Sequence, residues 1–174
     1  GINRLARVFR DIRPEKEVAA VSIMEHHSND LPHRKHMKEV VHIPLKQHNG
    51  SPGCVCLDSL EAVLKEREGQ INYVAMTGVS NVTGIINPIN EAAEICHKYD
   101  ALFLVDGAQL AAHIPLGMTV PENPLQNIDA LVFSGHKTYV PGSPGVVVAR
   151  KELLSQIEPE EVGGGMGDDV FEDT

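Results

Sequence analysis

Several features that would mark particular classes of protein are absent from this sequence. Only three residues are cysteine (Cys54, Cys56 and Cys96), and this odd number does not fit the paired disulfide framework of small secreted domains. No run of Lys and Arg exceeds two residues, and acidic residues outnumber basic ones by 24 to 15. A nucleic-acid or anionic-membrane surface is therefore not expected. No apolar run approaches the roughly 18 residues of a membrane span. No secretory signal opens the chain, so a cytoplasmic location is predicted.

The length and the two ends of the chain suggest a piece of a larger protein. A chain of 174 residues fits one domain and is long enough to bury a core. It begins at Gly1 without an initiator Met, and the helical apolar pattern that follows has no capping residue before it. Near the other end, residues 163–165 are all Gly and are interpreted as a hinge or linker. We expect an excised segment of a longer enzyme.

Apolar runs alternate with segments of helical spacing, which predicts an α/β fold. Strands are expected over residues 18–24, 39–45, 71–76, 101–105, 129–133 and 145–149, and helices over 57–68 and 88–100. Asp58 or Ser59 could cap the first of these helices. The polar, Gly- and Pro-containing stretch 46–56 is expected to be a loop. Runs 102–105 and 146–149 do not alternate in polarity, as is typical of parallel strands covered on both faces. The prediction is a mainly parallel (mixed) sheet with helices on both faces.

Chemically capable side chains follow four of these strands. The segments are Glu25-His26-His27-Ser28-Asn29, Thr77-Gly78-Val79-Ser80-Asn81, Asp106-Gly107-Ala108-Gln109 and Ser134-Gly135-His136-Lys137. In open α/β sheets, ligands bind beyond the carboxyl ends of the strands. The edge where these four segments meet is therefore the predicted site.

Lys137 and Asp106 suggest what this site could do. A lysine amine that is partly buried after an apolar strand has a lowered pKa and can form a Schiff base with an aldehyde. The simpler interpretation of Lys137 is a surface lysine in a turn, and that of Asp106 is a cap for the turn that follows it. Together they match pyridoxal phosphate, which needs an amine for its aldehyde and an acid for its pyridine nitrogen. His26 could stack on the ring and move protons, although a lone histidine more often caps or packs.

A metal site is the alternative that nine histidines raise. His33 and His36 are three residues apart on an expected helix, but the spacing matches neither the His-Glu-x-x-His pair nor a four-ligand zinc pattern. Cys54 and Cys56 are too close for the usual cysteine pair. No metal site is predicted. The histidines of this region are interpreted as a solvated, polar stretch, namely His33, His36, His42 and His48. Cys96 falls on the apolar face of a helix and is expected in the core.

The four strand-end segments, read in order, resemble the class V aminotransferase family of fold-type I pyridoxal phosphate enzymes. The nearest branch is that of the cysteine desulfurases and selenocysteine lyases. The motifs that carry the likeness are residues 25–29, 79–84, 105–109 and 134–137, and it extends from Gly1 to about Gly165. The resemblance implies that residues 1–165 are the central cofactor-binding part of the large domain and that 166–174 are a tail.

The resemblance also implies a role for each of seven residues around pyridoxal 5'-phosphate. Lys137 would hold the aldehyde and move the α-proton, and Asp106 would hold the pyridine nitrogen. His26 would stack on the ring, and Gln109 would bond the phenolic oxygen. Asn81 would lie near that oxygen and the substrate carboxylate, and Ser134 and His136 would bind the phosphate.

The implied reaction removes sulfur or selenium from cysteine or selenocysteine and leaves alanine. Intact relatives of this kind are homodimers, and a sulfur-acceptor protein is a possible partner. The family's phosphate turn, mobile-loop cysteine and carboxylate-binding arginine have no counterpart here, so little turnover is expected from this chain alone. Another class V activity (aminotransferase, epimerase or lyase) and a scaffold without cofactor are the alternatives. Residues 47–56 and 121–127 look longer than the usual family connections.

Overall fold

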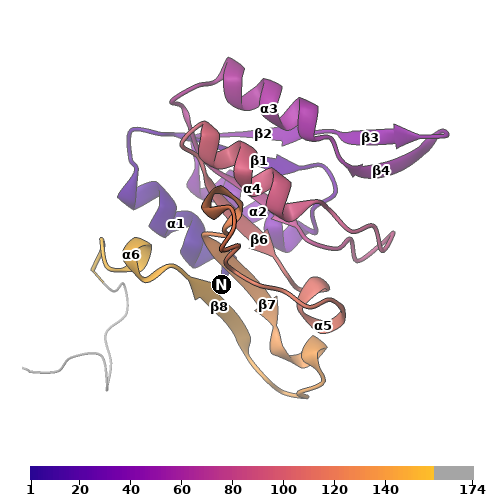
Figure 1. Cartoon of the computed structure of the whole chain (residues 1–174). Coiled ribbons are helices and arrows are strands. Elements are labelled where there is room, and N and C mark those ends of the chain that lie inside the picture. Colours follow the sequence, from indigo (N-terminus) through magenta and orange to yellow (C-terminus); the bar gives the residue numbers. More distant parts are fainter. Residues whose placement is uncertain (159–174) are drawn as a thin grey trace, which may run out of the picture.

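The computed structural model describes residues 1–158, which form a sheet between helices (Figure 1). The predicted linker at residues 163–165 and the predicted boundary at residue 165 lie outside this range. The elements in chain order are α1 (Ile2–Ile12), β1 (Val18–Ser22), η1 (His27–Asn29), α2 (Leu31–His36), β2 (Glu39–Ile43), β3 (Leu45–His48), β4 (Ser51–Val55), α3 (Leu57–Glu66), β5 (Ile71–Thr77), α4 (Ile89–Lys98), β6 (Leu102–Asp106), α5 (Leu110–His113), η2 (Pro124–Gln126), β7 (Ala130–Ser134), η3 (Gly135–Thr138), β8 (Gly145–Ala149) and α6 (Lys151–Leu154).

The main sheet has the strand order β2-β1-β5-β6-β7-β8 and is parallel up to β7, which confirms the predicted mainly parallel sheet. The last strand, β8, pairs antiparallel with β7 at the edge. Val147 and Val148 are each 39% exposed, so the expectation that this strand is covered on both faces is wrong. The connection from β7 to β8, residues 135–144, is shorter than the dozen or so residues that a parallel crossover needs.

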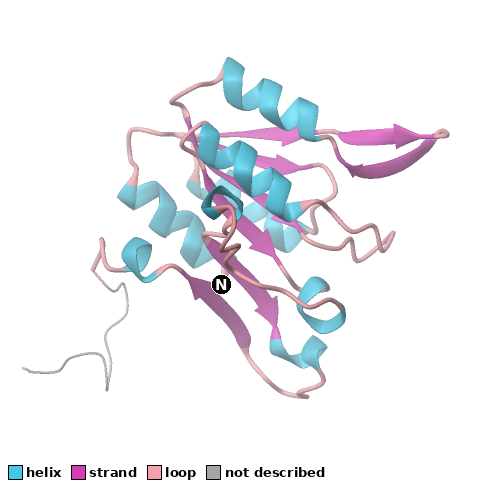
Figure 2. Cartoon of the chain, viewed as in Figure 1, coloured by secondary structure: helices cyan, strands magenta, loops and turns pink. Residues whose placement is uncertain are grey.

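Helices cover both faces of the sheet, as predicted (Figure 2). On one face, Leu5 and Phe9 of α1 lie one turn apart and pack on Tyr73 of β5, with the rings of Phe9 and Tyr73 5.2 Å apart. On the other face, α3 and α4 bury Leu60 and Cys96 against the sheet. Cys96 is fully buried, which confirms its predicted place in the core.

The stretch 46–56 is a hairpin and not the expected loop. Strands β3 and β4 pair antiparallel and extend beyond the main sheet (Figure 1). They are joined by Asn49 and Gly50, which have φ angles of 50° and 78°. Asn-Gly with two positive φ angles is the preferred two-residue hairpin turn, so the Asn49-Gly50 pair already indicated a hairpin in the sequence. The residue at the N-cap of α3 is Cys56, and the prediction of Asp58 or Ser59 is wrong.

The predicted solvated stretch of histidines is wrong for His33. His33 of α2 is fully buried, with its Nδ1 2.8 Å from the Tyr73 hydroxyl and its Nε2 3.1 Å from Asn29 Oδ1. His42 is exposed, with its Nε2 3.1 Å from Asp30 Oδ1. Among the helices of residues 1–158, none combines the length with the apolar character that a membrane span requires.

Candidate active site

The sheet brings the four strand-end segments to one edge. Strands β1, β5, β6 and β7 are consecutive neighbours and parallel, so their carboxyl ends lie side by side. Thr77, the last residue of β5, is the cross-strand partner of Asp106, the last residue of β6. The Gly107 amide then donates to the Val132 carbonyl of β7 at 2.7 Å. The candidate site is therefore a continuous row of strand ends.

Asp106 is the buried anion of this row, with only 5% of its surface exposed. Its Oδ1 accepts a hydrogen bond from the Ala108 amide at 2.9 Å, which is the turn-capping role considered from the sequence. Among residues 1–158, no cationic side chain lies within 4 Å of this carboxylate. Burial raises the pKa of Asp106, whereas the Ala108 amide and the charges of Lys137 and His26 lower it. Lys137 and His26 therefore act on the same carboxylate.

Lys137 lies in η3, directly after β7, and it is exposed. The expected burial of its amine is wrong, because the described residues leave the end of β7 open. The turn that carries it is nevertheless tightly packed. The Gly135 amide donates to the Pro144 carbonyl at 3.2 Å, and a Cβ at Gly135 would lie 2.9 Å from that same carbonyl oxygen. Only glycine fits this close approach, which fixes where Lys137 leaves the sheet.

His26 is exposed at the end of β1 and caps the short helix η1. Its Nδ1 accepts from the Ser28 amide at 3.2 Å and lies 2.8 Å from the Ser28 hydroxyl. In the neutral ring, Nε2 therefore carries the proton. The capping interpretation from the sequence is confirmed, and the same bonds fix the orientation of the ring.

The remaining predicted residues lie at the ends of β5, β6 and β7 or in the segments that follow them. Gln109 and Ser134 are half-buried, and Asn81 and His136 are exposed. Asn81 lies in a loop held by Ser80, whose Oγ accepts from the amides of residues 82 and 83. No hydrogen bond joins any two of the seven predicted residues in the described part of the chain. The site is a set of groups around an open edge.

Glu25 is a member of the site to which the sequence assigned no role. Its Oε1 accepts from the Thr77 amide at 2.9 Å and from the Ser22 hydroxyl, and its Oε2 accepts from Asn29 Nδ2 at 2.6 Å. Burial raises the pKa of Glu25 to about 7 against the effect of these bonds. The sequence feature that could have indicated a role for Glu25 is its position immediately before His26. Sequence alone, however, does not show whether a carboxylate at a strand end points into the site.

The donor set fits pyridoxal phosphate. A buried carboxylate without an ion pair suits a protonated pyridine nitrogen, because an ionised carboxylate away from water needs a cationic partner. Lys137 provides an accessible amine, and the exposed His26 provides a flat ring with a fixed orientation. The arrangement can hold a flat, anionic cofactor with its nitrogen at Asp106.

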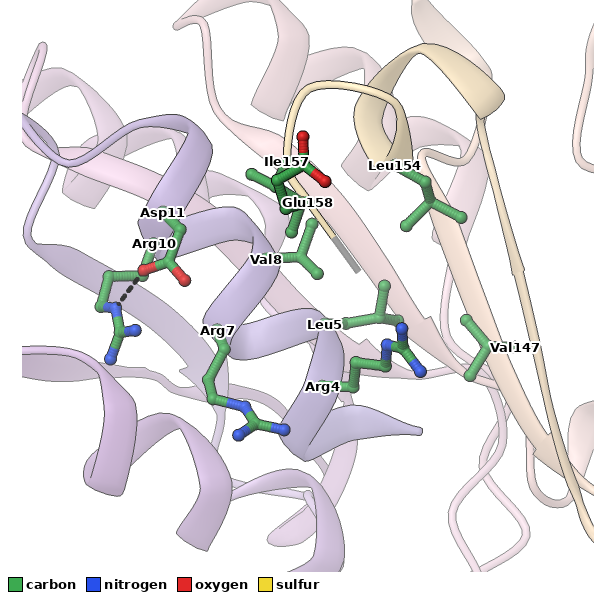
Figure 3. Close-up of a pocket in the computed structure, with 10 residues that line it drawn as sticks. All are labelled: Arg4, Leu5, Arg7, Val8, Arg10, Asp11, Val147, Leu154, Ile157 and Glu158. Atoms are coloured by element: carbon green, nitrogen blue, oxygen red, sulfur yellow. Dashed lines mark hydrogen bonds and ion pairs between the residues drawn. The ribbon is translucent and has the colours of Figure 1, made fainter. Parts of the chain in front are cut away.

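A cavity of about 800 Å³ lies elsewhere, between α1, β8 and the residues around α6 (Figure 3). Leu5, Val8 and Val147 line it together with the arginines of α1. None of the seven predicted site residues is among the residues that line it. The cavity and the candidate site are therefore separate features of the fold.

Comparisons with known proteins agree with this geometry. A family model described as aminotransferase class-V matches residues 1–174. A probable cysteine desulfurase of Halalkalibacterium halodurans is 36% identical over 160 residues, covering 90% of this chain and 36% of the relative. A cysteine desulfurase of Escherichia coli (strain K12 / DH10B) is 35% identical over 172 residues, covering 95% of this chain and 39% of the relative.

Solved structures give the same result. The cysteine desulfurase CsdA from Escherichia coli superposes with a TM-score of 0.78 at 30% identity, over 99% of this chain and 41% of that one. The apo structure of a cysteine desulfurase from Thermococcus onnurineus NA1 gives a TM-score of 0.78 at 29% identity, again over 99% and 41%. The chain thus spans about two fifths of the length of these relatives.

Proposed function

The chain belongs to the class V aminotransferase family, whose members depend on pyridoxal phosphate, and we propose that it is the cofactor-binding part of a cysteine desulfurase. The observation that carries the proposal is the buried Asp106 carboxylate at the end of β6, which has no cationic side chain within 4 Å among residues 1–158. The identity of about 35% to cysteine desulfurases supports this reaction over the other class V activities.

The bound cofactor supplies an electron sink for the electrons left at the substrate α-carbon when a proton is removed. Asp106 would keep a proton on the pyridine nitrogen, and burial strengthens this interaction because little water competes. Lys137 Nζ would bind the aldehyde carbon and move the proton at the α-carbon. His26 would cover one face of the ring, with the orientation that Ser28 gives it.

The half-buried and exposed groups of the row would hold the rest of the cofactor. Ser134 ends β7, His136 precedes Lys137 in the turn that follows, and both would bind the phosphate. Gln109, next to the Asp106 turn, would donate to the phenolic oxygen. Asn81 would lie near that oxygen and the substrate carboxylate. The same groups would act on selenocysteine, because cleavage of carbon–selenium and carbon–sulfur bonds needs the same proton transfers.

The open edge supports a homodimer in which a second copy covers the site. Val82 is 84% exposed and Tyr139 is 80% exposed, and they lie on the segments that follow β5 and β7. Exposed apolar side chains of this size mark interaction surfaces when they cluster. The three free cysteines fit a reducing compartment, the cytoplasm. With Lys137 open to water, we propose that this chain alone binds cofactor but turns over little cysteine.

The test is borohydride reduction of the protein with added pyridoxal phosphate, followed by peptide mass mapping. A pyridoxyl group on Lys137 that saturates at low cofactor concentration, and is lost in Lys137→Ala, is the expected result. Modification spread over many lysines and unchanged in Lys137→Ala would favour a scaffold without cofactor. Cysteine turnover comparable to that of a full-length desulfurase would contradict the low activity proposed for this chain.

A further inference from the structure

Two carboxylates lie one strand apart at the candidate site. Glu25 accepts a hydrogen bond from the Thr77 amide at 2.9 Å, and Thr77 is the cross-strand partner of Asp106. Among residues 1–158, neither carboxylate has a cationic side chain within 4 Å. When both carboxyls are ionised, they repel each other and lose hydration, which raises the free energy of the folded chain. The pair therefore favours either a proton or a cation between the strand ends.

A directed chain of hydrogen bonds holds Glu25 in this place. Asn29 Nδ2 donates to Glu25 Oε2 at 2.6 Å, so Asn29 Oδ1 is free to accept from His33 Nε2 at 3.1 Å. His33 Nδ1 then accepts from the Tyr73 hydroxyl at 2.8 Å. Each of these three hydrogen bonds has one donor and one acceptor when His33 is neutral. The chain runs from the core between α1 and the sheet to the site, and it leaves Glu25 little freedom to turn away.

We propose that Glu25 is a positioning residue that acts through Asp106: its negative charge, one strand away, helps Asp106 to hold the cofactor's pyridine nitrogen in its protonated form. This inference rests on the proposed function. Asp106, and not Glu25, would be the partner of the nitrogen, because Glu25 bonds to the backbone amide of Thr77 on the neighbouring strand. Its contribution is electrostatic, and it exists only while the Glu25 carboxyl is ionised.

The surroundings of Glu25 define when that charge is present. The neighbours that bond to it, Ser22, Asn29 and Thr77, are neutral, and the charged group that acts on it is Asp106 of β6. Burial raises the pKa of Glu25 to about 7. The fraction of Glu25 that carries a negative charge therefore rises as pH increases through this value. A cationic pyridine nitrogen at Asp106 would favour the ionised form, so cofactor binding and ionisation of Glu25 assist each other.

This linkage predicts a pH-dependent effect that a merely structural role would not produce. Glutamine has the shape of protonated glutamate, so Glu25→Gln is compared with the unchanged chain in titrations of pyridoxal phosphate followed by its absorbance. We expect the dissociation constant for Glu25→Gln to exceed that of the unchanged chain by at most about twofold at pH 6 and by about 3–10-fold at pH 8. Glu15→Gln is the matched control, since Glu15 is exposed and precedes β1 at its opposite end. It should bind as the unchanged chain does at both pH values.

A ratio of dissociation constants that is the same at pH 6 and pH 8 would overturn the inference. If Glu25→Gln does not fold, the unchanged chain decides the question: the side-chain ¹³C resonance of Glu25 is titrated with and without saturating cofactor. A midpoint that falls when the cofactor binds supports the proposal, and an unmoved midpoint overturns it. Failure of the unchanged chain to bind pyridoxal phosphate would instead overturn the proposed function.

Discussion

His97 Nε2 lies 2.9 Å from the fully buried Asp129 carboxylate, and its Nδ1 lies 2.6 Å from the Leu125 carbonyl oxygen. Both nitrogens face acceptors, so the ring must be protonated to satisfy them. Burial opposes the charge on His97, but the hydrogen bond and charge of Asp129 outweigh it and raise its pKa. The contact joins α4 to the start of β7 and to the connection between α5 and β7.

The first prediction follows from this ion pair. Because the folded-state pKa of His97 is raised, its contribution is full below the unfolded value of about 6.5 and is lost as pH rises through the folded value. Replacing His97 by Gln should cost about 1 kcal/mol of unfolding free energy at pH 5.5 and less at pH 8.5. Urea unfolding of both proteins at the two pH values checks this. An equal difference at both would contradict a protonated His97.

The second prediction concerns His33, which behaves in the opposite way. Burial lowers its pKa to about 4, so the unfolded chain takes up a proton that the folded chain does not. The His33 contribution is therefore full above pH 6.5 and is lost as pH falls toward 4. The difference in unfolding free energy between the unchanged chain and His33→Gln should grow by about 3 kcal/mol from pH 4 to pH 7. Because Glu25 also titrates in this range, the difference between the two proteins is the quantity to measure. A flat difference would show that His33 is not buried as described.

The third prediction separates binding from stability at Asp106. Burial of this carboxylate raises its pKa, which means that its charge costs stability in the absence of a cation. Asp106→Asn should raise the unfolding free energy of the cofactor-free protein at pH 7 by about 1 kcal/mol. The same change should weaken pyridoxal phosphate binding about tenfold or more, because the amide cannot compensate the pyridinium charge. Denaturant unfolding and cofactor titration measure the two effects. A loss of both stability and binding would mean that Asp106 is mainly structural.

The fourth prediction tests the turn that carries Lys137. A methyl group at Gly135 would contact Ser143 and the Pro144 carbonyl, whereas one at Gly117 would lie 3.5 Å from the Thr119 carbonyl oxygen, an ordinary contact. Gly135→Ala should lower the unfolding free energy by about 1–3 kcal/mol and reduce borohydride labelling of Lys137. Gly117→Ala is the control and should leave the labelling unchanged. Equal labelling of both variants would show that η3 does not fix Lys137.

The sequence predicted the features that depend on pattern along the chain. Asp106 and Lys137 could be placed at strand ends because apolar runs precede them, and Cys96 could be placed in the core from its position on an apolar helix face. Features that depend on which residues of other elements pack against a side chain could not be predicted. His33 is buried because Tyr73 and Asn29 satisfy both ring nitrogens, and they lie 40 and 4 residues away from it. The exposure of Lys137 depends on which segments cover β7, and the residue pattern around Lys137 does not indicate this.

The antiparallel pairing of β7 with β8 has a consequence for the order of folding. Ser134 and Gly145 face each other across the hairpin, so the turn that presents Lys137 closes through contacts that are local in the chain. Asp106 instead reaches the edge through parallel pairings, each of which spans a helix-length connection and costs more chain entropy to close. The amine-bearing turn should therefore gain amide protection before the carboxylate-bearing strand in pulsed hydrogen exchange during refolding. The two halves of the site would then form at different times during folding, with the turn that carries Lys137 before the strand end that carries Asp106.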